Sequence, residues 1–412
     1  MAKAGNTILL DLTDLFFGIG SGPMTGINRV GFAYLQMLCS DTEIPALGFV
    51  HHGRGALLLD REGMAWVKER LEGHQPWPET TLRARLRTDL PEIRQRAYAG
   101  IRAQAIESAH ALAIAPMLRR AAPGSGKVVV TGLRRLHRGA LKAFLDGGFQ
   151  PVVKVHDTIP LDFPDYVPKG GYRWFEERLA AVGELAALTL YNSEQTQADA
   201  ERHFARLGRV PPGLTAHLGV TALAPDPSQT PSTVASDRPV FVTVGTIEPR
   251  KNHALLLDIW DRLRESRPAR MPQLVIIGNR GWRNEAVHER LDAAAGGGDI
   301  VELQGLPDGA MAALIQRASA LLFPSHCEGF GLPAIEAAQL GTPVICNDLP
   351  VFGEYLGNYP LMIPANDPER WQREIEAHAN GQAPPRPVPP PLPTWDAYFA
   401  KVLPRLEQLE IP

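Results

Sequence analysis

The chain has 412 residues, of which 44% are hydrophobic and 21% are charged, and its formal net charge at pH 7 is −3. This length is too great for one ordinary hydrophobic core, and the composition excludes a disordered or fibrous chain. The three cysteines are scattered without metal-ligand spacing, which argues against a disulfide scaffold and against a zinc site.

Neither a membrane span nor a secretion signal is expected. No run approaches the ~20 apolar residues that would cross a bilayer. The apolar run near the N-terminus is interrupted by Asp11 and Asp14, and no small-residue cleavage site follows a basic start. We therefore expect a cytoplasmic protein whose only membrane contact would be peripheral, on the inner face of the plasma membrane.

Short apolar runs, each closed by a turn residue and followed by an amphipathic stretch, recur along the chain and predict parallel βα units. Residues 61–120 indicate a mostly helical insertion. Residues 223–238 are rich in Pro, Ser, Thr and Asp and predict a linker between two α/β domains. The strands are expected over 7–12, 128–131, 152–156 and 187–192 before the linker, and over 240–245, 273–278, 300–304, 320–323 and 343–346 after it.

A glycine-rich turn over residues 18–29 joins the first strand to a helix. Its spacing is not that of a dinucleotide fingerprint, and no acid ends a second strand, so a nicotinamide-dependent oxidoreductase is a poor alternative. Arg29 lies one turn into the helix, and we expect it to contact an acceptor phosphate.

Residues 93–142 form the most basic stretch, with a single acid, Glu107. Two interpretations remain open, namely a solvated face or a patch that meets anionic lipid or a lipid-diphosphate acceptor. Nucleic acid is not expected as a partner, because aromatic residues are not interleaved with these charges.

Two strand ends in the first half carry polar residues where ligands sit in open α/β sheets. His156 and Asp157 close one strand, and Ser193 opens the turn after another. A buried structural histidine and a plain helix N-cap are the alternatives for His156 and Ser193.

In the second half, Arg250 and Lys251 follow the first strand and enter a helix. An arginine fork and a lysine point charge suit a diphosphate, whereas a solvated charge pair is the alternative.

Glu328 and Glu336 flank a second loop, between a buried strand and a helix expected over 333–340. The preceding glycines leave free amides at the helix N-terminus, which suits phosphate, and Glu336 could accept two sugar hydroxyls. The alternative is that Glu336 only caps the helix and the glycines only turn the chain.

The runs EGFGLPAIEA (328–337) and GTIEPRKN (245–252) resemble signature motifs of glycosyltransferase family 4. The resemblance implies an α/β, GT-B architecture, in which two Rossmann-like doubly wound domains face a central cleft, and a retaining mechanism. It implies an acceptor-binding domain over 1–222 and a donor-binding domain over 239–394. The apolar helix expected over 395–412 then docks back on the first domain.

The resemblance also implies roles for individual residues. It assigns catalytic roles to His156, Arg250, Lys251 and Glu328. The expected acceptor-binding residues are Arg29, from its place in the helix alone, and Asp157 at the end of its strand. The donor-binding residues are Gly26, Ser193, Gly245, Arg250, Lys251, Gly278, Asn279, Leu306, Gly329, Phe330, Gly331, Leu332 and Glu336. No Asp-x-Asp motif or His/Cys ligand cluster occurs, so neither a metal nor another cofactor is expected.

The runs HDTIPLDFPDY, NSEQT and GTIEPRKNH look most like bacterial mannosyltransferases of polysaccharide or O-antigen assembly. The expected donor is GDP-mannose, and the expected acceptor is a saccharide or lipid-linked saccharide. UDP-sugars, GDP-fucose and dTDP-rhamnose remain open as donors. A GT-B sugar-nucleotide epimerase or hydrolase is the alternative activity.

Overall fold

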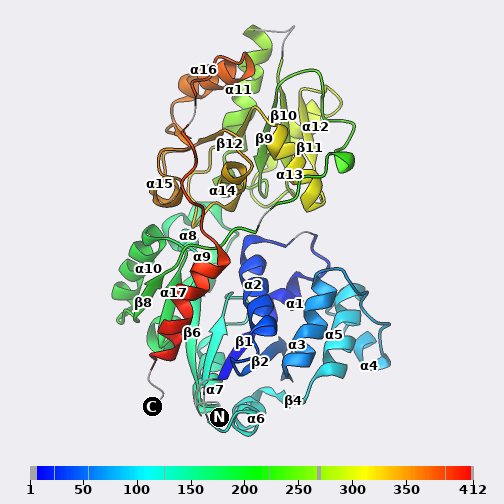
Figure 1. Ribbon diagram of the computed structural model, residues 1–412, viewed down its shortest axis with the longest axis vertical. Helices are drawn as coiled ribbons and strands as arrows, with labels where there is room; N and C mark the ends of the chain where they lie inside the picture. The colour runs from blue at the N-terminus through cyan, green and yellow to red at the C-terminus, as the bar shows by residue number, and fades with distance from the viewer. Residues whose placement is uncertain are drawn as a thin grey trace.

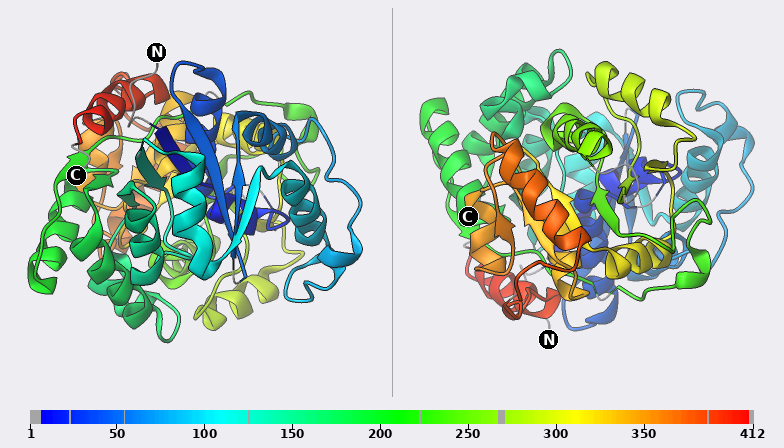
Figure 2. Two further views of the ribbon diagram at one scale, coloured as in Figure 1. Left: turned by 90° about the horizontal axis from the view of Figure 1, so that it is seen from below. Right: turned by 90° about the horizontal axis from the view of Figure 1, so that it is seen from above.

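The computed structural model describes residues 7–22, 24–53, 55–124, 126–221, 223–266, 271–385 and 387–409. Two α/β lobes are stacked along the long axis of the molecule (Figure 1). The end-on views show helices on both faces of the sheets (Figure 2). The expected fold class, α/β with two Rossmann-like domains, is therefore confirmed.

The N-terminal lobe contains an eight-stranded sheet of order β4-β3-β2-β1-β5-β6-β7-β8. Its pairs are parallel except β2·β3 and β3·β4, which are antiparallel. The strands are β1 (Thr7–Asp11), β2 (Ala46–His52), β3 (Gly55–Leu59), β4 (Glu107–His110), β5 (Gly126–Val130), β6 (Phe149–Val155), β7 (Leu188–Tyr191) and β8 (Gly213–Thr215).

The stretch 61–120 is largely helical, as predicted, but Glu107–His110 also contributes an antiparallel edge strand. Only four residues long, this strand is too short for its alternation to stand out from the helices beside it. The helices of the lobe are α1 (Thr13–Gly18), α2 (Gly26–Ser40), α3 (Arg61–Leu71), α4 (Leu82–Arg85), α5 (Glu92–Gln104), α6 (Ile114–Ala121), α7 (Arg138–Asp146), α8 (Ile159–Asp162), α9 (Gly171–Leu185) and α10 (Glu194–Leu207).

The C-terminal lobe contains a parallel six-stranded sheet of order β11-β10-β9-β12-β13-β14. Its strands are β9 (Val240–Val244), β10 (Gln273–Ile277), β11 (Ile300–Leu303), β12 (Ala320–Phe323), β13 (Val344–Cys346) and β14 (Leu361–Met362). Its helices are α11 (His253–Ser266), α12 (Glu285–Ala294), α13 (Asp308–Arg317), α14 (Leu332–Gln339), α15 (Pro350–Leu356) and α16 (Pro368–Ala379).

The strand order of the C-terminal lobe reverses at β9, which pairs with β10 on one side and with β12 on the other. In open α/β sheets the loops at such a switch point diverge and leave a crevice at the carboxyl ends of the strands. The loops that follow β9 and β12 carry the two predicted motifs, so the topology itself brings these motifs together.

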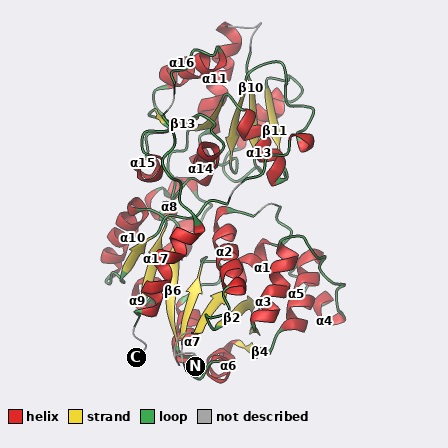
Figure 3. Ribbon diagram, viewed as in Figure 1, coloured by secondary structure: helices red, strands yellow, loops and turns green. Residues whose placement is uncertain are grey.

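The last helix, α17 (Trp395–Glu407), returns to the N-terminal lobe and lies beside α2 and β6 (Figures 1 and 3). The hydroxyls of Tyr398 and Tyr34 are 2.9 Å apart, and Nζ of the fully buried Lys154 lies 5.1 Å from the centre of the Tyr398 ring. Residues 410–412 of the expected helix lie outside the described ranges.

The basic stretch 93–142 does not form an open patch of free charge. Lys127 is buried, and most of the arginines bond to carboxylates or backbone carbonyls of their own lobe. These arginines are Arg94, Arg96, Arg119, Arg120, Arg134 and Arg138. Among the described residues no helix combines the length and the apolar character that a bilayer crossing requires.

Candidate active site

A charge cluster occupies the switch point of the C-terminal lobe. Glu328, on the loop after β12, places Oε1 2.5 Å from Nζ of Lys251 and Oε2 2.9 Å from Nη1 of Arg250. Nε of Arg250 lies 2.8 Å from the carboxylate of Glu248. Three of the four residues predicted to be catalytic, Arg250, Lys251 and Glu328, therefore meet, and these ion pairs leave Nη2 of Arg250 unused.

Because the side chains of this cluster are buried, their charges strongly shift one another's pKa values. Burial alone would raise the pKa of Glu328, but the charges of Arg250 and Lys251 outweigh it and lower that pKa to about 2. Burial lowers the pKa of Lys251, and Glu328 opposes that shift. Nζ of Lys251 also lies 4.6 Å from the centre of the Phe323 ring. The cluster thus holds two cations, already paired with Glu328 and Glu248, in a largely desolvated site, where their charge acts strongly on a nearby anion.

Two predicted donor-binding glycines allow the loops around this cluster to approach each other. Gly245 has φ +144°, and the side chain of Lys251 lies directly over it. A Cβ on Gly278 would collide with the backbone oxygen of Gly245. The backbone oxygen of Asn279 accepts a hydrogen bond from the amide of Ile247 at 2.9 Å, which ties the two loops together.

The helix that follows Glu328 begins as the sequence predicts. Gly331 is its N-cap, with φ +87°, and Pro333 stands in the first turn, although α14 begins at Leu332 rather than at 333. Glu336 is almost completely buried, and its carboxylate is paired with the guanidinium of Arg29 from α2 of the other lobe. Arg29 was expected to meet an acceptor phosphate, whereas in this structure it lies against Glu336, the acid predicted to accept sugar hydroxyls of the donor.

Little space is left around this pair. A cavity of about 20 Å³ remains between the glycine-rich turn at Gly26, the non-regular segment at 218–221 and Glu336. Nη2 of Arg29 also lies 3.8 Å from the Asp308 carboxylate at the start of α13. A nucleotide needs a pocket of roughly 300 Å³ or more. Arg29 therefore fills the space next to Glu336 in this structure.

On the N-terminal side of the cleft, His156 is held by its own lobe. Its Nε2 lies 2.7 Å from the carbonyl oxygen of Thr131, which can only accept, so Nε2 carries the proton. Nδ1 then faces the amide nitrogen of Asn192 at 3.4 Å. A Cβ on Gly329 would collide with the backbone of His156 and crowd Asp157, so the Glu328 loop packs directly against these two residues.

Burial shifts the pKa values of His156 and Asp157 in opposite directions. Burial, helped by the charge of Lys154, lowers the pKa of His156 from 6.5 to about 4. Burial raises the pKa of Asp157, and the facing Arg250 works in the opposite direction. His156 is thus a neutral group in the cleft, and Asp157 is coupled to the charge cluster across it.

The titration of His156 provides a direct check. We expect its ring to stay neutral down to about pH 5 in NMR spectra, with the signal assigned through His156→Gln. Because the unfolded state binds the proton first, the contribution of His156 to stability falls as the pH drops from 6.5 through about 4. A titration midpoint near 6.5 in the folded protein would contradict this environment.

Hydrogen bonds across the cleft hold the lobes closed. The hydroxyls of Ser193 and Thr196 donate to the carbonyl oxygen of Gly329 at 3.1 and 3.2 Å. The Glu354 carboxylate accepts from the amides of Glu194 and Gln195 at 2.8 and 2.9 Å, so a side chain of one lobe caps a helix of the other. Ser193 is both the N-cap of α10 and an inter-lobe contact.

The other predicted donor-binding residues lie around this centre. A Cβ on Gly26 would meet Leu332 at 3.4 Å, which brings the glycine-rich turn against α14. Phe330 is buried, with its ring centre 4.6 Å from that of Tyr355. Leu306 is half-buried and packs against the core.

Sequence reasoning missed a set of aromatic contacts between the lobes. The Tyr166 ring stacks on the His326 ring at 5.5 Å between centres, and the Trp282 indole donates to the carbonyl oxygen of Tyr166 at 2.8 Å. The signal was present, because Phe163 and Tyr166 follow His156 and Asp157 in the same run. The inter-lobe partners of Tyr166, namely His326 and Trp282, are distant in sequence and meet it only when the lobes come together.

Known proteins resemble the chain in sequence and in fold. Residues 227–386 match the family of glycosyl transferases group 1. The serotype-specific mannosyltransferase WbdA of Escherichia coli is 32% identical over 236 residues, which cover 54% of this chain and 29% of that protein. The O-antigen chain mannosyltransferase B of Escherichia coli is 30% identical over 227 residues, which cover 52% of this chain and 58% of that protein.

These alignments reach less than a third of WbdA and somewhat more than half of the second relative. Among solved structures, Anabaena HepE in complex with UDP-glucose superposes on the chain with a TM-score of 0.57. The alignment covers 98% of this chain and 98% of HepE at 13% sequence identity, so the likeness concerns the fold alone. The chain thus has the GT-B fold, and the residues that match the glycosyl transferases group 1 family lie mainly in its C-terminal lobe.

Proposed function

We propose that this protein is a glycosyltransferase that moves a hexose from a nucleotide-sugar donor to a saccharide acceptor in bacterial surface-polysaccharide assembly. The observation that carries the proposal is the cluster of Arg250, Lys251 and Glu328 at the switch point, with Glu336 on the adjoining helix. The mannosyltransferase names of the relatives from Escherichia coli support it.

The proposed reaction is retaining and belongs to family 4. The bond between the anomeric carbon and the diphosphate oxygen breaks while the acceptor oxygen bonds to the same face, and the acceptor proton passes to the departing phosphate oxygen. Arg250 and Lys251 stabilise the charge that develops on this diphosphate. These two cations would make a metal ion unnecessary for that task.

GDP-mannose is the proposed donor. The two relatives described above are mannosyltransferases by name, which favours mannose. HepE was crystallised with UDP-glucose, so UDP-sugars stay in the comparison as donors.

A thermal-shift panel tests the donor site. It contains GDP-mannose, GDP, UDP-glucose, UDP-GlcNAc, UDP and NADH, applied to the wild type, Arg250→Ala and Glu336→Ala. Arg290→Ala is the matched control, because Arg290 pairs with two carboxylates, Asp258 and Asp261, on the outer surface of the same lobe.

Stabilisation by guanine nucleotides that both site variants lose and Arg290→Ala keeps would support the proposal. Stabilisation by no nucleotide would refute it, and stabilisation by NADH alone would favour an oxidoreductase. Product analysis with and without a mannose-containing acceptor then separates transfer from epimerisation or hydrolysis of the donor.

A lipid-linked acceptor and a cytoplasmic location at the inner membrane face are part of the proposal. Many basic residues in 93–142 bond to groups of their own lobe, so fewer positive charges are free to bind anionic lipid than the sequence indicated. Flotation with anionic liposomes at low and high salt tests the proposed membrane contact. An absence of binding at low salt would contradict this contact.

A further inference from the structure

Three parallel aromatic rings form a ladder at the junction of the lobes. The rings of Phe163 and Tyr166 are stacked, with centres 5.9 Å apart and planes 15° apart. Tyr166 continues the stack to His326, with centres 5.5 Å apart and planes 12° apart. Phe163 is 41% exposed, so the ladder ends in an aromatic surface that is open to solvent.

Both lobes build this ladder. Phe163 and Tyr166 belong to the segment after α8, whereas His326 belongs to the loop that leads to Glu328. Trp282, also 41% exposed, joins the group by donating from Nε1 to the carbonyl oxygen of Tyr166. Nη1 of Arg283 donates to the carbonyl oxygen of Val167 at 3.0 Å.

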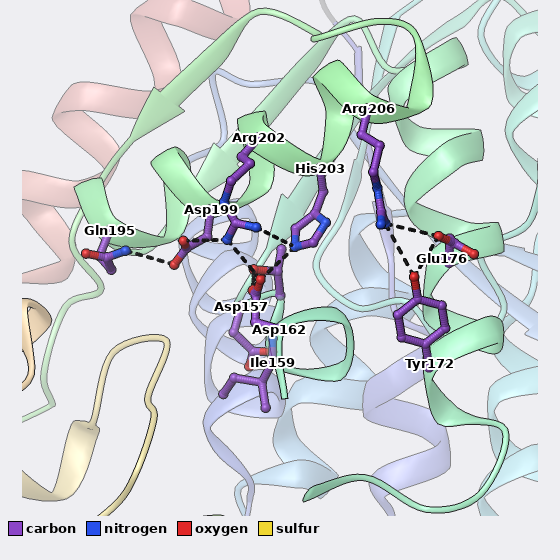
Figure 4. A network of polar contacts seen from close by, with 11 residues as sticks. Asp157, Ile159, Asp162, Tyr172, Glu176, Gln195, Asp199, Arg202, His203 and Arg206 are labelled. Atoms are coloured by element: carbon purple, nitrogen blue, oxygen red, sulfur yellow. Dashed lines mark hydrogen bonds and ion pairs between the residues drawn. The ribbon is translucent and has the colours of Figure 1, made fainter. Parts of the chain in front are cut away.

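The N-terminal half of the ladder is braced from behind. The Asp162 carboxylate accepts hydrogen bonds from Thr158 at 2.5 Å and from Arg202 and His203 at 2.8 Å each (Figure 4). This network fixes the short helix α8, which ends one residue before Phe163. The exposed ring therefore stands on a rigid support, as a binding surface requires.

The ladder is continuous with the charge cluster. His326 is two residues before Glu328, and Phe163 follows Asp157 through the single turn of α8. The carbonyl oxygen of Cys327 accepts a hydrogen bond from Arg250 at 3.2 Å. A molecule lying on the ladder would thus reach toward the residues that hold the transferred sugar in the proposed function.

Because Tyr166 is stacked between Phe163 and His326, the aromatic surface that the ladder offers consists of the free face of Phe163 and the exposed part of Trp282, beside unused polar groups. Within the described chain, neither the Asp165 carboxylate nor the ring nitrogens of His326 bond to another residue. Burial lowers the pKa of His326, so its ring is neutral and can both donate and accept. Pyranose rings expose faces of C–H groups that pack on aromatic rings, while their hydroxyls seek such polar groups.

We propose that Phe163, Tyr166, His326 and Trp282 form a saccharide subsite that receives the acceptor. The inference rests on the proposed function and deepens it by naming where the acceptor chain lies. Because residues of both lobes make the subsite, it is complete only when the lobes are closed, and acceptor binding then favours closure.

Phe163 offers the cleanest test, because none of its described contacts crosses to the other lobe. Wild type, Phe163→Leu and Phe163→Trp are titrated with α-linked mannotriose by calorimetry, with and without saturating GDP. Trp174→Leu is the matched control, because Trp174 is 42% exposed in the same lobe and its ring stacks with Arg178 of its own helix. GDP binding is measured on all four proteins.

Phe163→Leu is expected to raise the Kd for mannotriose about tenfold, the scale of one aromatic contact, and to leave GDP binding unchanged. Phe163→Trp should bind mannotriose within about threefold of the wild type, and Trp174→Leu should match the wild type. The subsite is refuted if the wild type does not bind mannotriose, if Phe163→Leu binds it normally, or if Trp174→Leu weakens it equally. If mannotriose binding depends on Phe163 but no nucleotide binds, the subsite stands and the donor part of the proposed function fails.

Discussion

Replacing Arg250 with alanine is expected to lower the rate of sugar transfer by about a hundredfold or more. In the proposed reaction the leaving diphosphate gains charge, and Arg250 offers a guanidinium fixed on two carboxylates, with Nη2 still unused. Each charge-assisted hydrogen bond to such a group contributes about 1.5–3 kcal/mol. Arg250→Lys should recover only part of the loss, because lysine cannot fork two oxygens.

The measurement is kcat/KM for donor and acceptor, made on protein whose folding is verified by circular dichroism. Arg290→Ala controls for the loss of an arginine that bridges two carboxylates, and it should keep wild-type activity. An Arg250→Ala protein with undiminished transfer would show that the cluster is a structural ion-pair network.

The same variant changes how stability depends on pH. In the wild type the pKa of Glu328 falls from 4.5 to about 2, so its paired carboxylate stabilises the fold above pH 4.5 and loses this effect as the pH falls through about 2. Without Arg250 the pKa of Glu328 should move back up. The wild type's advantage over Arg250→Ala in urea unfolding should therefore shrink as the solution becomes acidic.

The charge cluster could be predicted from the sequence. Arg250 with Lys251 and Glu328 follow two buried strands, and a parallel sheet gathers the loops at its carboxyl end. Neighbouring strands and short loops then leave little freedom for these side chains, and the structure brings them within hydrogen-bonding distance.

The contacts between the lobes could not be predicted from the sequence. Arg29 and Glu336 lie on different lobes, and neither local pattern contains information about the angle between the lobes. The stack of Tyr166 on His326 depends on the same closure. Glu354, which caps α10, carries no sequence signal for this role, because its partners are backbone amides that any sequence could supply.

Arg29→Met is expected to produce two changes of opposite sign. The unfolding temperature of the free protein should fall, because Glu336 is almost completely buried and loses its cation. Since Arg29 is 28% exposed, the free energy of unfolding should fall by about 1–2 kcal/mol, which is less than the loss expected for a fully buried ion pair. The stabilisation by a saturating nucleotide should grow, with binding tighter by up to about tenfold.

The opposite signs follow from the two roles that Arg29 combines. It neutralises Glu336 in this structure, and it fills the space that a sugar on Glu336 would need, since only about 20 Å³ is left there. A nucleotide must therefore displace it, and the free energy of the pair is subtracted from binding. In Glu336→Gln the Arg29→Met change should have little effect on either quantity, because the pair is already gone. If Arg29→Met instead weakens nucleotide binding in the wild-type background, Arg29 is a ligand of the donor and not its competitor.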